Sequence, residues 1–269
     1  MIKIGIRAHD IGKMDAYSLA EKVKSYGFSG VQLVLKKALI EYSDLDIIKD
    51  AFKNLEIMLL GAYFNPVHPN EDIVNEGIKN FEEHIKIASK LNVKYVGSET
   101  GSLMGSLWGY VEENHSQESL ARVIEIFYGL VNLAKEYNVK VAIEGAYAHV
   151  AFSPERVKEV IDAIDSDNLK VTVDLFNFLN MNNYSNHIEI LNRCFDLFKD
   201  KIAVFHLKDF IVVNGKLIQV GLGKGLMDYP RIINRIKAKT PNTFLIFEGV
   251  INEDIIDSLE YINSLLEKR

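Results

Sequence analysis

The chain has 269 residues, with 31 Lys and Arg against 37 Asp and Glu, and a formal net charge of −6. This length suits a single barrel domain of about 250 residues, and the absence of any basic run argues against nucleic-acid binding and favours a small-molecule partner. Cys194 is the only cysteine, which excludes an intrachain disulfide, and no signal-like segment or apolar run of about 18 residues occurs, so we expect a soluble, cytoplasmic protein.

Short β-rich runs alternate with longer amphipathic segments along the whole chain, as βαβ units require. The predicted strands occupy residues 2–7, 30–35, 57–62, 93–98, 139–144, 169–174, 202–207 and 243–248. Eight such strands predict an α/β fold, a single (β/α)8 TIM barrel formed by one domain over residues 1–269.

The segments between the strands carry helix and turn signals. Apolar residues recur at helical spacing from Asp72 to Leu91, and Ser153 followed by Pro154 is typical of a helix start. Two connections are long or rich in glycine: residues 99–116, which contain the only tryptophan, and residues 210–228, which we expect to form a hairpin turning at Asn214-Gly215 and then a glycine loop.

Four side chains with metal-binding chemistry stand where predicted strands end. Glu144 ends VKVAIE, Asp174 ends LKVTVD, His206 ends IAVFH and Glu248 ends TFLIFE. Because the strand ends of a TIM barrel converge on one rim, we expect these groups to meet. Three carboxylates and one imidazole suit a divalent cation, with Mn2+ the first choice and Mg2+, Co2+ or Zn2+ the alternatives.

Each of these residues also has an ordinary interpretation. An acid just beyond a strand is often a helix N-cap or a solvated loop residue, and His206 could be a core imidazole bonded to a backbone carbonyl. If the metal site exists, a sugar bound through two adjacent oxygens completes it, and a metal-stabilised enediolate forms when a carbon-bound proton is removed. Glu144 and Glu248 are then the natural acid/base pair.

Further polar residues are candidates to line the same rim and bind substrate. Each can equally be an ordinary polar or packing residue, and the candidates are His9, Gln32, Asn65, Glu99, Trp108, Lys208 and Asp209. A phosphate site is conceivable at residues 221–225, where glycine amides and Lys224 could hold an anion, although no dinucleotide or P-loop fingerprint occurs.

The chain resembles the xylose-isomerase-like barrel superfamily, in particular its sugar phosphate isomerase/epimerase branch, which includes tagatose 3-epimerase, inosose isomerase and inosose dehydratase. The resemblance rests on the order of the segments LGAYFNPVHP, KYVGSETG, VKVAIEGA, LKVTVDLFN, VFHLKDF, VGLGKGLMDY and FLIFEG. It implies that Glu144, Asp174, His206 and Glu248 are the metal ligands, that the two glutamates are the acid and base, and that a homodimer or homotetramer forms.

The chain departs from the family pattern at three positions. Asn177 stands where many members carry a second histidine, Val212 where epimerases carry an arginine, and Val150 where ketose epimerases carry another glutamate. These departures disfavour a standard ketohexose 3-epimerase, and they leave Asn177 as a candidate substrate-binding group.

The favoured function is a metal-dependent isomerase or epimerase of a sugar or polyol. The alternative is a metal-dependent dehydratase of an inosose-like keto sugar. Less favoured are a DNA-repair endonuclease of this fold, which needs several zinc ions and a basic surface, and a sugar-binding barrel without catalysis.

Overall fold

The computed structural model describes residues 2–106 and 109–268. The chain forms two compact units. The first comprises Met1–Met58, Asp174–Asp196 and Val204–Arg269, and the second comprises Leu59–Val173 and Leu197–Ala203.

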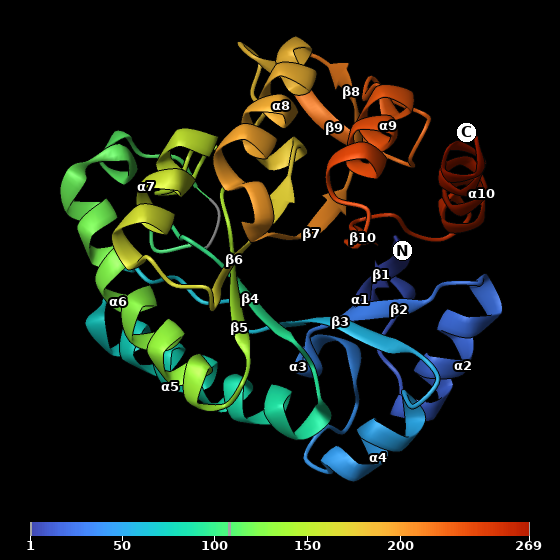
Figure 1. Ribbon diagram of the computed structural model, residues 1–269, viewed down its shortest axis with the longest axis horizontal. Coiled ribbons are helices and arrows are strands. Elements are labelled where there is room, and N and C mark those ends of the chain that lie inside the picture. The colour runs from blue at the N-terminus through green and yellow to red at the C-terminus, as the bar shows by residue number, and fades with distance from the viewer. Residues whose placement is uncertain (1, 107–108, 269) are drawn as a thin grey trace. The chain divides into compact units, whose positions relative to one another are not determined.

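The first unit contains a parallel sheet in the order β2-β1-β10-β7. The strands are β1 (Lys3–Arg7), β2 (Gly30–Leu33), β7 (Ile202–Leu207) and β10 (Phe244–Phe247). Its longer helices are α2 (Ala16–Tyr26), α4 (Leu45–Ala51), α8 (His187–Phe198), α9 (Tyr229–Lys239) and α10 (Asp254–Glu267), and its short ones are α1 (Ala8–Ile11) and α3 (Leu35–Ala38). Helices α9 and α10 lie side by side (Figure 1). At Gly30 a side chain would collide with the backbone carbonyl of Glu56, so this close approach requires glycine.

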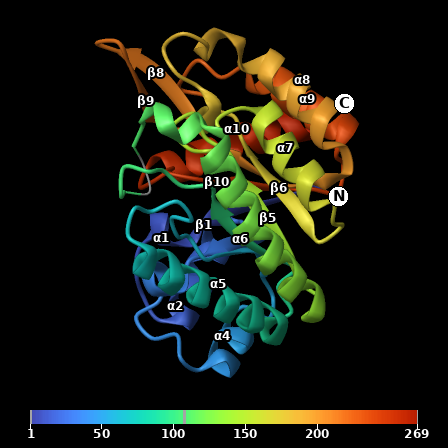
Figure 2. The same ribbon diagram turned by 90° about the vertical axis from the view of Figure 1, so that its left-hand side faces the viewer.

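The second unit contains a parallel sheet in the order β3-β4-β5-β6. The strands are β3 (Glu56–Gly61), β4 (Tyr95–Glu99), β5 (Lys140–Glu144) and β6 (Leu169–Asp174), and the helices are α5 (Glu71–Leu91), α6 (Gln117–Glu136) and α7 (Pro154–Ile164). Helices α5 and α6 run alongside each other in both views (Figures 1 and 2). Phe81 of α5 and Phe127 of α6 contact edge to face, with 6.3 Å between ring centroids, and bury the apolar stripes of both helices.

The eight parallel strands follow the order β1-β10-β7-β6-β5-β4-β3-β2, which closes into a barrel. The predicted (β/α)8 fold is therefore confirmed, and each predicted strand is present within two residues of its expected ends. The prediction of one domain over residues 1–269 stays a prediction.

A two-stranded hairpin follows β7 in the chain. Strands β8 (Asp209–Val213) and β9 (Lys216–Val220) pair antiparallel, and Asn214 and Gly215 turn between them with φ values of 48° and 72°. Positive φ at both turn residues is what a two-residue hairpin needs, so the prediction from Asn-Gly is confirmed.

Cys194 of α8 is buried, and none of the helices formed by residues 2–106 and 109–268 has the length and apolar character to cross a membrane.

Candidate metal centre

Four potential metal ligands lie at the carboxyl ends of strands and are withdrawn from solvent. Glu144 ends β5, Asp174 ends β6, His206 is the penultimate residue of β7, and Glu248 directly follows β10. Asp174 is 0% exposed, Glu144 and His206 are each 3% exposed, and the side chain of Glu248 is 12% exposed. One ligand atom from each of the four residues lies within 4.8 Å of all the others, so the group could hold a metal ion.

Three of these residues and a buried lysine form a dense set of contacts. Nδ1 of His206 lies 2.8 Å from Oε2 of Glu248 and 3.8 Å from Oδ2 of Asp174. Nζ of Lys208 lies 2.8 Å from Oδ2 of Asp174 and 2.9 Å from Oε1 of Glu248, and it also donates to Oδ1 of Asn177 at 3.1 Å. The predicted residues Asp174, His206, Glu248, Lys208 and Asn177 are therefore in one cluster, and His206 faces a carboxylate instead of serving only as a core imidazole.

Arg7 and Asp10 join this cluster, and the sequence interpretation did not include them. Arg7 Nη1 donates to Oε1 of Glu248 at 2.6 Å, while its Nε and Nη2 donate to the Asp10 carboxylate at 2.8 to 3.1 Å. Oδ2 of Asp10 also accepts the backbone N–H of Gly249 at 2.6 Å. The only sequence signal was an arginine at the end of the first strand with an acid three residues later.

The electrostatic environment of Glu248 favours its carboxylate form. Burial by itself would raise the pKa of Glu248, but the positive charge of Lys208, the neighbouring His206 and the Arg7 guanidinium together hold that pKa well below its usual range. His9, on α1, shows the opposite effect of burial on a base: burial, followed by the charges of Arg7 and Lys37, lowers the pKa of His9 to about 4. Its imidazole is therefore neutral at pH 7.

Glu99 and Glu144 are neighbours at the ends of β4 and β5, where they are register partners. Glu144 is also the register partner of Thr172 in β6, two positions before Asp174. Both glutamates are buried. Parallel strands in register present such side chains at the same edge of the sheet, which explains why acids far apart in sequence can share a site.

Asn65 holds two connecting loops together. Its amide nitrogen donates to the carbonyls of Ser102 and Ser106 at 2.6 and 3.3 Å, and its amide oxygen accepts the N–H groups of Val67 and Ser102 at 3.2 and 3.0 Å. These bonds join the loop after β3 to the loop after β4. Trp108 of the latter loop falls outside the described residues, so its predicted contact with a sugar stays a prediction.

Asp209 anchors the glycine loop. Its Oδ1 accepts the N–H groups of Phe210 and Met227 at 2.8 and 3.0 Å, and its Oδ2 accepts those of Gly223 and Gly225 at 2.9 and 3.0 Å. The ammonium of Lys224, the other group considered for anion binding, is paired with Asp254 and Asp257 on α10. The prediction of a phosphate site at residues 221–225 is therefore wrong, because the N–H groups of Gly223 and Gly225 already donate to the carboxylate of Asp209.

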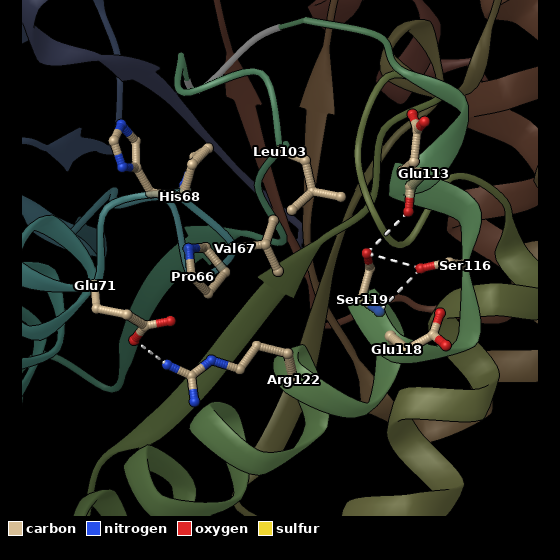
Figure 3. A pocket seen from close by; sticks show the side chains of 11 residues that line it. Pro66, Val67, His68, Glu71, Leu103, Glu113, Ser116, Glu118, Ser119 and Arg122 are labelled. Atoms are coloured by element: carbon tan, nitrogen blue, oxygen red, sulfur yellow. Dashed lines mark hydrogen bonds and ion pairs between the residues drawn. The ribbon is translucent and has the colours of Figure 1, made fainter.

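A separate cavity of about 410 Å³ lies within the second unit (Figure 3). Pro66, Val67 and Leu103 contribute apolar surface, and the ion pair between Arg122 and Glu71 spans 2.5 Å at its edge. Among the predicted site residues that the structure describes, none lines this cavity.

Comparison with known proteins agrees with the fold. A family model described as xylose isomerase-like TIM barrel matches residues 20–265. An uncharacterized protein of Methanocaldococcus jannaschii, MJ1311, is 21% identical over 261 residues, which cover 93% of this chain and 84% of that protein.

Three solved structures illustrate the likeness. A D-tagatose 3-epimerase-like protein has a TM-score of 0.80 at 19% identity, covering 98% of this chain and 97% of its own. The 3-keto-D-glucoside 4-epimerase of E. coli has a TM-score of 0.79 at 16% identity, covering 98% and 100%. The IOLI protein with a bound zinc atom has a TM-score of 0.75 at 18% identity, covering 98% and 96%. At such identities the structures show a shared fold.

Proposed function

Because the chain belongs to the xylose isomerase-like TIM barrel family, we propose that it is a divalent-metal-dependent isomerase or epimerase of a sugar or polyol. The observation that carries this proposal is the largely buried group of Glu144, Asp174, His206 and Glu248, which each offer a ligand atom within 4.8 Å of those of the others. Buried acids at strand ends need a compensating charge, and a divalent ion provides it.

The donor set and the local charge both fit a divalent ion. Three carboxylates and one imidazole are ligands for Mn2+, which we propose first, and for Co2+, Zn2+ and Mg2+. The carboxylates of Glu144, Asp174, Glu248 and Asp10 together with the cations Arg7 and Lys208 carry a formal charge of 2 − 4 = −2, with the histidine counted as neutral. The zinc atom in the structurally similar IOLI protein supports the choice of a divalent ion.

In this proposal the protein moves a proton between two faces of one substrate carbon. The bound ion supplies stabilisation for the negative charge that develops on substrate oxygens. Glu248, held as a carboxylate by its cationic neighbours, can accept the carbon-bound proton, and Glu144 can return one from the other side. The two glutamates come from β5 and from the end of β10, which are separated by β6 and β7 in the strand order.

Substrate hydroxyls are proposed to contact the polar groups beside this pair. Lys208 contacts the carboxylate of Asp174 and donates a hydrogen bond to the side chain of Asn177. His9, which is neutral, can donate or accept a hydrogen bond. Glu99 adds a carboxylate next to Glu144. Asn65, Asp209 and Trp108 are proposed to border the substrate.

Metal analysis tests the proposal directly. Wild type should contain about one divalent ion per chain after loading with Mn2+, and the ion should be lost in Glu144→Gln, Asp174→Asn, His206→Ala and Glu248→Gln. Glu56→Gln, which removes an exposed carboxylate paired with Lys3, is the matched control and should keep the metal. A folded wild type that binds none of Mn2+, Co2+, Zn2+ and Mg2+ would reject the proposal.

Solvent-deuterium uptake tests the reaction. Ketoses, inososes and their phosphates should be incubated with the metal-loaded protein in heavy water and followed by NMR and mass spectrometry. Deuterium at the carbon next to the carbonyl, without loss of water, supports isomerisation or epimerisation, whereas loss of water from the substrate supports the dehydratase alternative. Binding with neither change supports a sugar-binding barrel.

A further inference from the structure

We infer that Arg7 and Asp10 are positioning residues that hold Glu248 through both its side chain and its main chain. The inference rests on the proposed function, since it concerns the orientation of a proposed metal ligand and base. Arg7 lies on β1 and Asp10 on the short helix α1. They are 241 and 239 positions away in sequence from their partners Glu248 and Gly249.

The side-chain half of this contact fixes one oxygen of Glu248. Arg7 Nη1 reaches Oε1 at 2.6 Å, and Lys208 reaches the same oxygen at 2.9 Å. The other oxygen, Oε2, lies 2.8 Å from Nδ1 of His206. Each carboxylate oxygen thus has its own neighbours, and the carboxylate plane cannot rotate without breaking a short charged contact.

The main-chain half acts through Gly249. Asp10 accepts the Gly249 N–H, while the carbonyl of Glu248 accepts a hydrogen bond from the Gln219 side chain at 2.5 Å. Gly249 has a φ of 69°, so the chain turns immediately after Glu248. Asp10 therefore holds the peptide bond between Glu248 and Gly249 in place, where the chain turns after β10.

One guanidinium links the two halves. Arg7 forms a fork with Asp10 through Nε and Nη2 and still reaches Glu248 through Nη1. A lysine ammonium carries the same charge but cannot make this planar three-point contact. The side chain of Asp10 is only 6% exposed and that of Arg7 is 23% exposed, so the fork is partly shielded from water.

Co2+ binding to the purified full-length protein tests the assignment, because visible absorption reports both the affinity and the ligand geometry. Arg7→Lys keeps the charge and removes the fork, and Asp10→Asn keeps the shape but turns an N–H donor toward Arg7 or Gly249. We expect each variant to bind Co2+ about 10-fold to 100-fold more weakly, with an altered absorption band. Lys3→Met, which removes an exposed ion pair from the amino end of the same strand, is the matched control and should bind Co2+ as wild type does.

The outcomes separate this inference from the proposed function. If wild type binds Co2+ and both folded variants bind it within about twofold of wild type with an unchanged spectrum, the positioning role is wrong and the metal proposal stands. If wild type binds no Co2+ or other divalent ion, both fail. Thermal unfolding checks each variant, and a loss of Tm without any change in Co2+ affinity or spectrum would reduce Arg7 and Asp10 to a structural ion pair and overturn the inference.

Discussion

The two carboxylate oxygens of Glu248 have different neighbours. One oxygen meets Arg7 and Lys208, and the other meets His206. Burying a carboxylate without partners is costly, so these contacts keep the group ionised inside the protein. His9, in contrast, is a base that burial and the charges of Arg7 and Lys37 keep neutral by lowering its pKa.

The neutral state of His9 predicts a pH dependence of stability. Its pKa is lowered from 6.5 to about 4 in the folded protein, so between these values the unfolded chain binds more protons than the folded one. Stability should therefore fall as the pH decreases from about 6.5 to about 4. Allowing for partial exposure of the ring, we expect the contribution to be about 1–2 kcal/mol.

Urea unfolding of wild type and His9→Gln at pH 7, 6, 5 and 4.5 measures this effect. The variant, which has no titrating side chain at position 9, should lose less stability over this pH range. Parallel curves for the two proteins would show that His9 is not buried in the neutral form.

The four proposed ligands could be predicted from the sequence because each ends an apolar run, and strand ends converge in a barrel. Arg7 and Asp10 could not, because an arginine after a strand is usually solvated and nothing local indicates a partner 241 positions away. Asp209 was recognised as polar and close to the site, yet its bonds to four backbone N–H groups depend on how the following loop folds back.

At the scale of elements, the glycine loop of residues 221–227 is organised by a carboxylate. Asp209→Ala should leave four backbone N–H groups without their acceptor and cost about 3–4 kcal/mol of the free energy of unfolding. Asp209→Asn, which retains one acceptor oxygen, should cost less. Chemical unfolding gives the two energies, and amide hydrogen exchange at Gly223, Gly225 and Met227 should accelerate most in the alanine variant.

Two glycines with open space around the missing side chain provide a paired test of the backbone. Gly215 has a φ of 72° in the hairpin turn, whereas Gly129 lies within α6, and a Cβ at either position would meet no atom within 4 Å. Gly215→Ala should destabilise by about 1 kcal/mol, because an alanine is strained at that φ. Gly129→Ala should stabilise by about 0.5–1 kcal/mol, because alanine is the better helix former. If both substitutions changed the free energy of unfolding in the same direction, as measured with denaturant, the assigned backbone conformations would be contradicted.

Strand positions were predictable because buried parallel strands leave β-branched runs between helical patterns. The second strand ends at Leu33, earlier than expected, because Leu35–Ala38 forms a helical turn. The apolar run Leu33-Val34-Leu35 does not show where the strand ends and the turn begins. The glycine loop misled the sequence interpretation, since glycine amides suggest an anion site whether the anion is a ligand or, as here, a side chain of the protein.

For the whole molecule, metal binding should appear as added thermal stability. At a free ion concentration of 100 times Kd, binding to the folded state alone contributes about 2.7 kcal/mol, which corresponds to a Tm increase of about 5–10 °C for a chain of this size. Unfolding in Mn2+ should therefore occur at a higher temperature than in EDTA. Glu144→Gln should show little difference between the two conditions, and a wild-type Tm unaffected by any of the four metals would contradict a metal site.

The barrel could be predicted from the alternation of strands and helices in the sequence, and the family match agrees with it. The substrate could not be predicted, because specificity depends on which loop side chains face the site. Asn65 and Asp209 show the difficulty: both are polar residues after strands, and both bind backbone groups of neighbouring loops.

Gly249 has a consequence for mutational tolerance. Any side chain there would be strained at a φ of 69° and would displace the Gln219 amide from the Glu248 carbonyl. In a library of all single substitutions selected for activity, position 249 should thus be almost as intolerant as position 248, although it contributes no functional group. Attempts to evolve a new specificity should vary the neighbouring loops and keep this glycine fixed.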